Sequence, residues 1–75
     1  MTREAYLRLV GSRIGNQRRW VGLSQQDFAE LVGMSRVTLS AIEGGKHPAG
    51  LLTYLKVART LGVRMGDLLD EEAAR

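Results

Sequence analysis

The sequence predicts an all-α fold, a compact five-helix domain that occupies residues 1–75. Glycines and glycine-containing pairs divide the 75 residues into five pieces of helical length. Within these pieces the apolar residues recur at helical spacing, and no segment alternates with a period of two for long enough to form a strand. The expected helices span residues 4–21, 25–32, 36–43, 51–61 and 65–71, to within a residue or two.

The first helix, residues 4–21, mixes apolar residues at helical spacing with four arginines, and Arg3 directly precedes it. Gly11 and Gly15 lie one turn apart within it. Each costs about 1 kcal/mol relative to alanine in a helix. We therefore expect either close packing of another helix at these glycines or local looseness.

The second helix, residues 25–32, is predicted to begin after Ser24 as its N-cap residue. Asp27 follows three positions later, close to a capping box. Gly33 suits the left-handed position that ends a helix. The residues expected to form the apolar face of this helix are Phe28, Ala29, Leu31 and Val32.

The remaining three helices show similar boundaries. Ser35 is a natural N-cap for residues 36–43, which should bury Leu39 and Ile42 and end at Gly44-Gly45. In residues 51–61 the apolar stripe comprises Leu51, Leu55, Ala58 and Leu61, closed by Gly62. A last turn of helix, residues 65–71, carries Leu68 and Leu69.

The junction Gly33-Met34-Ser35 joins two helices that are each too short to be stable alone, since isolated helices below about 12–15 residues are marginal in water. Two helices joined by such a turn form a helix-turn-helix. In DNA-binding versions the first helix crosses the phosphate backbone and the second lies in the major groove. The junction therefore predicts that residues 36–43 protrude as a reading helix.

The composition restricts the function. The net charge is +3, but residues 1–66 carry +6 and residues 67–75 carry −3. A basic body suits a polyanion such as nucleic acid, although mild basicity also serves solubility. There is no cysteine and only one histidine, which excludes disulfides and thiolate zinc sites, makes a His-rich metal site unexpected, and suits a reducing cytosol.

Other classes of function find little support. No apolar run approaches the roughly 18 residues of a membrane span, and no signal peptide is visible, so no membrane partner is expected. No serine, histidine and acid stand at usable spacing, and Gly44-Gly45-Lys46 lacks the rest of a phosphate-binding loop. We expect no enzyme activity and no cofactor.

A set of short motifs extends over about residues 9–69. It comprises Arg13-Ile14, Arg18, Gly22-Leu23-Ser24-Gln25, Phe28-Ala29, Gly33, Ser35-Arg36, Leu39-Ser40-Ala41-Ile42-Glu43, Gly45-Lys46 and Leu61-Gly62-Val63. In this combination the sequence resembles the XRE family of helix-turn-helix proteins, which includes phage Cro and lambda repressor. The resemblance implies a lambda-repressor-like bacterial or phage domain in the cytoplasm, associated with the nucleoid. It also implies that the partner is double-stranded DNA and that a homodimer binds a pseudo-palindromic operator.

The sequence departs from the family pattern at a few positions. Gln17 stands where an apolar residue is common, and Gly44 stands where arginine or asparagine is common. In Pro48-Ala49-Gly50 the proline comes one place earlier than in the family, and a glycine takes the expected N-cap. We expect these changes to affect the stability of that loop and not the fold.

Helical geometry predicts which residues read DNA bases. With Leu39 and Ile42 buried, the outward face of residues 36–43 consists of Arg36, Val37, Thr38 and Ala41. Arginine can pair bidentately with guanine, and exposed valine or alanine can contact a thymine methyl group. The alternatives are a solvated Arg36 and marginal core packing of Val37.

A second group is expected to contact phosphates without reading sequence. In the resembling family a glutamine at the position of Gln25 reaches a phosphate. The full set of candidates is Gln25, Gln26, Ser35, Ser40, Lys46, Arg13 and Arg19. For the charged members ordinary solvation is the alternative, and for Ser40 the favoured alternative is a position near the backbone or in solvent.

Two further expectations are structural. The resemblance implies a partly buried ion pair between Arg18 and Glu43. Trp20, Leu52, Met65 and Leu69 form a candidate dimer surface, with core packing as the alternative.

The sequence favours a transcriptional regulator, either a repressor or a controller protein. The alternative is an antitoxin-type or protein-interaction module that binds a partner protein, such as a toxin, and represses its own promoter. The sequence does not identify such a partner.

Overall fold

Five α-helices account for most of residues 1–71, the part of the chain that the computed structural model describes, and this part contains no strand. The fold class predicted from the sequence is confirmed. The helices are α1 (Arg3–Trp20), α2 (Gln25–Val32), α3 (Arg36–Glu43), α4 (Leu51–Leu61) and α5 (Met65–Leu69). No helix among the described residues is long and apolar enough to cross a membrane.

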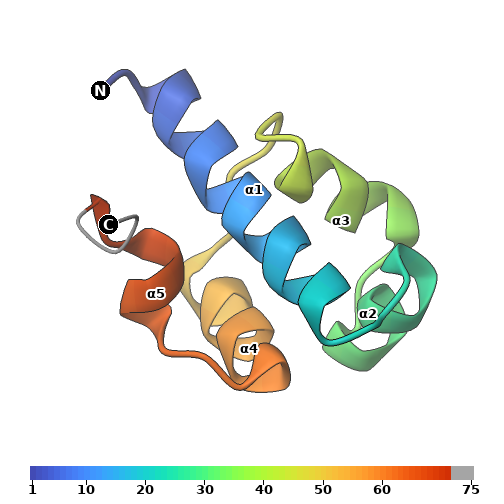
Figure 1. Cartoon of the computed structure of the whole chain (residues 1–75). Coiled ribbons are helices and arrows are strands. Elements are labelled where there is room, and N and C mark those ends of the chain that lie inside the picture. The colour runs from blue at the N-terminus through green and yellow to red at the C-terminus, as the bar shows by residue number, and fades with distance from the viewer. Residues whose placement is uncertain (72–75) are drawn as a thin grey trace.

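The long helix α1 organises the molecule (Figure 1). It packs against α3, α4 and α5, while α2 packs against α3 and α4. Among residues 1–71 the core contains eleven buried apolar residues, of which the largest fully buried side chains are Phe28, Ile14, Leu39, Leu68, Val10 and Val57. All five helices contribute to this single core.

Two leucines that the sequence assigned to the core lie on the surface instead. Leu31 is 62% exposed, because α2 turns Phe28, Ala29 and Val32 inwards and leaves Leu31 on its outer side. Leu51 is 69% exposed, because it is the first residue of α4 and only the later part of that helix reaches the core. These two assignments were wrong.

Of the two alternatives expected at Gly11 and Gly15, the structure shows close packing against another helix at Gly11. A Cβ atom at Gly11 would lie 2.4 Å from the carbonyl oxygen of Ile42 and 2.5 Å from that of Glu43. Because both contacts are with backbone of α3, only glycine lets the two helices approach so closely. At Gly15 the nearest atoms belong instead to side chains, those of Glu43 and Arg19.

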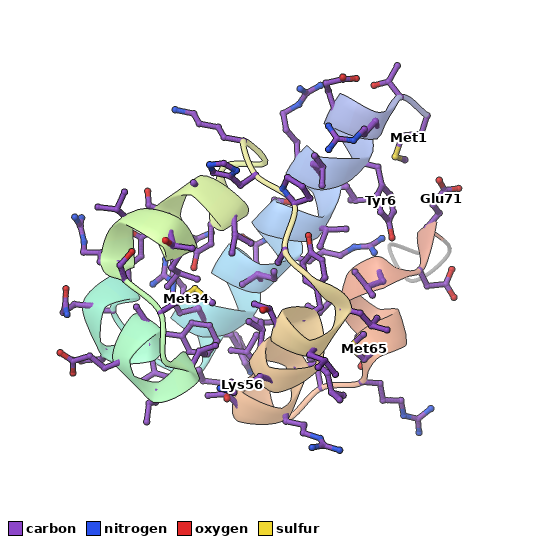
Figure 2. The ribbon with its side chains drawn as sticks, turned by 180° about the vertical axis from the view of Figure 1, so that it is seen from behind. Met1, Tyr6, Met34, Lys56, Met65 and Glu71 are labelled. Carbon is purple, nitrogen blue, oxygen red and sulfur yellow. The ribbon has the colours of Figure 1, made fainter. Side chains whose placement is uncertain are left out.

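The ends of the helix-turn-helix follow the expected chemistry. The hydroxyl oxygen of Ser24 accepts a hydrogen bond from the Asp27 amide, and that of Ser35 accepts one from the Thr38 amide, each at 3.0 Å. Gly33 ends α2 with a φ of +82°. The Met34 side chain packs against the core beneath the turn (Figure 2). These contacts fix the direction in which α3 leaves α2.

The N-cap residue of α4 is Gly50, which has no side chain to cap the helix. Other contacts therefore hold the loop between α3 and α4. Gly45 has a φ of +72°, and a Cβ there would lie 2.7 Å from the Cα of Arg8. The Tyr54 hydroxyl accepts a hydrogen bond from the Ala49 amide at 3.1 Å. The loop is therefore anchored to both α1 and α4.

The helix expected at residues 65–71 is shorter than predicted and ends at Leu69, with Asp70 in an extended conformation. Side chains of α1 bind the carbonyls of this last turn. The Arg13 guanidinium donates to the carbonyl oxygens of Leu68 and Asp70, and the Tyr6 hydroxyl donates to that of Leu69. Figure 2 shows Tyr6 reaching toward this end of α5. Carbonyls satisfied in this way do not need another turn of helix.

The first helix is displaced by one residue from the expected segment and begins at Arg3 instead of residue 4. The cause is Thr2, whose hydroxyl oxygen accepts a hydrogen bond from the Ala5 amide and caps the helix. Val21 is the C-cap residue and not part of the helix.

Candidate nucleic-acid interface

The outward face of α3 is exposed along its length. Arg36, Val37, Thr38 and Ser40 are exposed, and Ala41 is half-buried, while Leu39 and Ile42 point into the core. Val37 is 76% exposed, so it does not serve as core packing.

A shallow hollow lies on this face of the molecule. Its lining residues are Arg36, Val37, Ser40 and Ala41 of α3 and Lys46 of the following loop. The lining thus combines two positive charges, those of Arg36 and Lys46, with the apolar side chains of Val37 and Ala41. The hollow brings together three of the four predicted base-reading residues and two of the predicted phosphate contacts.

The start of α3 is tightly organised. The Ser35 hydroxyl accepts from the Thr38 amide and donates to the Thr38 hydroxyl at 2.8 Å. Both side chains are exposed, but their polar groups already serve the helix cap. Thr38 does not line the hollow described above.

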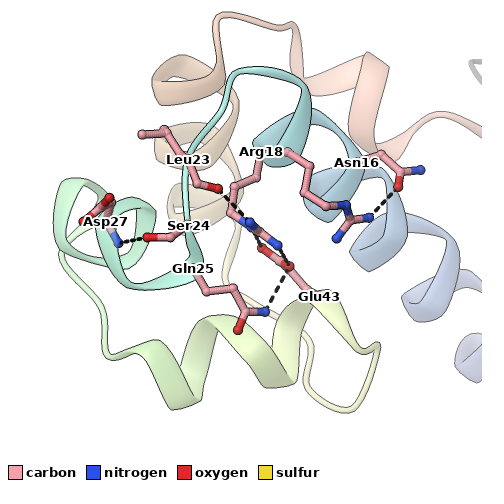
Figure 3. A network of polar contacts seen from close by, with 8 residues as sticks. Asn16, Arg18, Leu23, Ser24, Gln25, Asp27 and Glu43 are labelled. Carbon is pink, nitrogen blue, oxygen red and sulfur yellow. Dashed lines mark hydrogen bonds and ion pairs between the residues drawn. The ribbon is translucent and has the colours of Figure 1, made fainter.

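Arg18 and Glu43 form a bidentate ion pair that joins α1 to α3 (Figure 3). The Arg18 Nε–Glu43 Oε2 distance is 2.7 Å and the Arg18 Nη2–Glu43 Oε1 distance is 3.0 Å. The Nη1 atom of Arg18 donates to the Leu23 carbonyl oxygen at 2.7 Å, so the same guanidinium also holds the segment before α2. Both side chains are only 8% exposed. Such a pair fixes geometry more than it adds stability, because burial costs each charge its hydration.

The side chains at the start of α2 are also engaged. The Gln25 Nε2 atom donates to Glu43 Oε1 at 3.2 Å, which adds Gln25 to the ion-pair network (Figure 3). Gln26 Nε2 donates to Glu30 Oε1 at 3.0 Å on the exposed side of the helix. Gln25 therefore lies against the C-terminal end of α3, and Gln26 faces outwards beside it.

The two arginines of α1 that were predicted to contact phosphates lie in different places. Arg13 lies on the side of α1 that faces α5, with hydrogen bonds of 3.0 Å and 2.6 Å to the carbonyl oxygens of Leu68 and Asp70. It therefore acts as a structural clamp on α5 and not as part of the α3 face. Arg19 is exposed, and its Nη2 atom donates to Asn16 Oδ1 at 2.7 Å.

The four residues of the candidate dimer surface differ in exposure. Trp20 is 84% and Leu52 78% exposed, whereas Met65 and Leu69 are half-buried and pack against the core. Leu52 lines a second shallow hollow together with Met34 and Lys56. Leu31 and Leu51, which the sequence analysis assigned to the core, are also large exposed apolar side chains.

The sequence reasoning missed Asn16, which holds Arg19. The available signal was the spacing of three residues along a helix, which places two side chains on the same face. It also missed Tyr54, whose bond to the loop no sequence motif indicated.

Comparison with known proteins shows which family the chain resembles. The HTH_3 helix-turn-helix family model matches residues 14–68, which include the whole helix-turn-helix. An uncharacterized HTH-type transcriptional regulator from Methanothermobacter thermautotrophicus is 35% identical over 65 residues, which cover 83% of this chain and 94% of the relative. The regulator YgzD from Bacillus subtilis, also named as uncharacterized, is 35% identical over 63 residues, covering 81% of this chain and 96% of that protein.

A solved structure agrees with these sequence relatives. The restriction-modification controller protein C.AhdI from Aeromonas hydrophila superposes with a TM-score of 0.81 at 33% identity, over 85% of this chain and 97% of that protein. The resemblance drawn from the sequence motifs is confirmed, and the chain belongs to the HTH_3 helix-turn-helix family.

Proposed function

We propose that this protein is a transcriptional regulator that binds double-stranded DNA in a sequence-specific manner through α3. The observation that carries the proposal is the exposed hollow lined by Arg36, Val37, Ser40, Ala41 and Lys46. It combines hydrogen-bond donors, positive charge and apolar contacts on one helix and the loop that follows it, which is what a major groove requires. The relatives named as HTH-type transcriptional regulators support the same function.

The residues divide into two roles in this proposal. Arg36 would pair with a guanine, Val37 and Ala41 would contact thymine methyl groups, and Thr38 would face the base edges beside them. Phosphates would be contacted by a wider set, which comprises Lys46, Ser40, Ser35, Gln25, Gln26 and Arg19. Arg13 is not part of this set because α5 occupies its guanidinium.

We further propose that two copies bind a pseudo-palindromic operator, as a repressor or as a controller protein. The similarity to a restriction-modification controller supports the second role. A regulator of this kind would act in the cytoplasm, at the nucleoid. Half-sites should lie about 34–36 Å apart, one helical turn of DNA. Sedimentation of the free protein and of its DNA complex tests this arrangement, and a strict monomer on one asymmetric site would contradict it.

The alternative function, a module that binds a partner protein and represses its own promoter, has one observation in its favour. Trp20, Leu31, Leu51 and Leu52 are large apolar side chains that are each at least 62% exposed. Exposed apolar residues of this kind can mark a protein interface. The two functions are compatible, since repression of the module's own promoter also requires DNA binding by α3.

Selection from a pool of random duplexes tests the proposed function directly. The protein should enrich a defined sequence, and its affinity for that sequence should fall steeply between about 50 mM and 200 mM salt, since phosphate contacts release counterions. The matched control is the Arg36→Ala, Lys46→Ala double variant, which changes only the exposed hollow. Absence of enrichment, or binding that does not respond to salt, would reject the proposal.

A further inference from the structure

Arg19 is held by a neighbouring side chain. Its Nη2 atom donates to the side-chain carbonyl oxygen of Asn16 at 2.7 Å, one turn earlier on α1. Both residues are exposed, so this bond is not required to satisfy a buried group. A surface arginine otherwise samples many rotamers, and fixing it on a partner costs side-chain entropy. The bond to Asn16 restricts the arginine before any partner arrives.

The position in which Arg19 is held lies above Gly15. A Cβ atom at Gly15 would be 3.3 Å from Arg19 Nη1 and 3.1 Å from Glu43 Oε1. The guanidinium of Arg19 and the carboxylate of Glu43 therefore share the space that a larger residue at position 15 would occupy. Asn16 and Gly15 together place Arg19 on the α3 side of α1.

The charges around this position leave Arg19 in excess. Glu43 is neutralised by Arg18, whose Nε and Nη2 both donate to its carboxylate, and the Nη1 of Arg18 donates to the Leu23 carbonyl. Gln25 donates to the same Glu43 Oε1 atom. One positive charge therefore remains in this cluster, that of Arg19.

The chemistry of Asn16 suits this arrangement. An amide oxygen accepts a hydrogen bond from a guanidinium without a negative charge, so it orients Arg19 and leaves its charge for an anion. A carboxylate at the same position would also orient the arginine but would cancel the charge.

We propose that Asn16 is a positioning residue for DNA binding: it holds Arg19 over Gly15, where the arginine contacts a DNA phosphate. This inference rests on the proposed function and adds to it a residue outside the helix-turn-helix. Arg19 touches the phosphate, and Asn16 acts only through Arg19. Holding the arginine in advance lowers the entropy cost of binding, which is how preorganisation raises affinity.

A double-mutant cycle with the whole chain tests the inference. The variants are Asn16→Ala, Arg19→Ala and their combination, with Arg59→Ala, an exposed arginine on α4, as the charge control. Affinity is measured against the duplex selected by the parent protein over a range of salt concentrations. Urea unfolding of each variant identifies any change in stability, and we expect little change because both side chains are exposed.

The expected pattern has three parts. Asn16→Ala weakens binding about two- to tenfold, the range of one ordinary hydrogen bond. Arg19→Ala lowers the slope of log K against log salt by about 0.9, the value for one phosphate contact. In the Arg19→Ala background, Asn16→Ala causes no further loss.

Two results would overturn the inference while leaving the proposed function intact. The first is an Arg19→Ala variant that binds DNA like the Arg59→Ala control. The second is an Asn16→Ala substitution that has no effect, or that has the same effect with and without Arg19. Failure of the parent protein to bind any duplex would instead reject the proposed function, and the inference with it.

Discussion

Gly11 marks the closest approach between α1 and α3, and its replacement by alanine tests whether this approach determines the fold. An added Cβ would lie 2.4 Å from the Ile42 carbonyl oxygen, 2.5 Å from the Glu43 carbonyl oxygen and 2.8 Å from the Glu43 carbonyl carbon. Real Cβ atoms essentially never come within 3.0 Å of such atoms. All three belong to backbone, so no side-chain rotation can relieve the contact, and the helices must separate.

The magnitude follows from two opposing effects. Alanine raises helix propensity by about 1 kcal/mol relative to glycine. Overpacking of a tight interface typically costs about 1–3 kcal/mol and sometimes more, and a contact with rigid backbone belongs at the upper end. We therefore expect Gly11→Ala to lower the free energy of unfolding by about 2 kcal/mol. For a domain of this size that corresponds to a fall in Tm of about 8–16 °C.

Gly15→Ala is the matched control, since it makes the same change one turn later on the same helix. Its Cβ would meet only side-chain atoms, Glu43 Oε1 at 3.1 Å and the Arg19 guanidinium nitrogens at 3.3 Å and 3.5 Å. The exposed Arg19 guanidinium can move away, and only the Glu43 carboxylate, held by Arg18, has to give by a few tenths of an ångström. The propensity gain should offset part of this cost, and we expect a loss of at most about 1 kcal/mol. Urea unfolding followed by circular dichroism measures both variants.

The comparison can refute the reasoning. If Gly11→Ala is as stable as the parent, or if the two variants lose the same stability, then backbone contact at Gly11 does not control the packing of α3 against α1.

The other predictions concern the cap, the ion pair and the reading face. Ser35→Ala should cost about 0.5–2 kcal/mol in urea unfolding and Ser35→Gly only a few tenths, because glycine tolerates the N-cap conformation; equal losses would argue against the cap. Glu43→Gln should cost up to about 3–5 kcal/mol by stranding the nearly buried Arg18 charge, and an unchanged urea midpoint would argue against this. In duplex selection Arg36→Ala should relax preference at one base pair per half-site, by about 1–3 kcal/mol, while Lys46→Ala weakens all sequences alike and lowers the salt slope by about 1. A selection profile for Arg36→Ala that matches the parent would remove Arg36 from base readout.

The helices could be predicted from the sequence because their ends are determined locally. Ser24, Gly33 and Ser35 each act through bonds to residues within a few positions, and such signals are visible in a single sequence. The end of α5 was not predictable in this way. It is determined by Arg13 and Tyr6, which lie more than fifty residues away along the chain.

The burial of individual leucines was predicted less well than the helices. Leu31 and Leu51 fit an apolar pattern, yet both are exposed. The periodicity of apolar residues shows which side of a helix faces the core, but not how far along that side another helix packs. Leu31 and Leu51 both lie beyond the part that is covered. Periodicity alone does not contain this information, since it depends on how the helices cross.

The face of α3 was anticipated from helical geometry, but the contacts around it depend on long-range structure. Arg13 and Arg19 look equivalent in the sequence, as two arginines on one helix. The structure separates them, because Arg13 meets carbonyls of α5 whereas Arg19 meets Asn16 on its own helix. A count of basic residues cannot distinguish a charge used for folding from a charge left for a partner.

The ion-pair network suggests why stability and DNA recognition should be coupled in this chain. Arg18 bonds both to Glu43, the last residue of α3, and to the backbone of Leu23 just before α2. The angle of α3 thus depends on one guanidinium that also holds the start of the helix-turn-helix. Because buried ion pairs add little net stability but tolerate little change in geometry, the network acts mainly on orientation. A substitution in it that left the protein folded would therefore be expected to weaken binding to the selected operator more than binding to unrelated DNA, since phosphate contacts tolerate a rotated reading helix better than base contacts do.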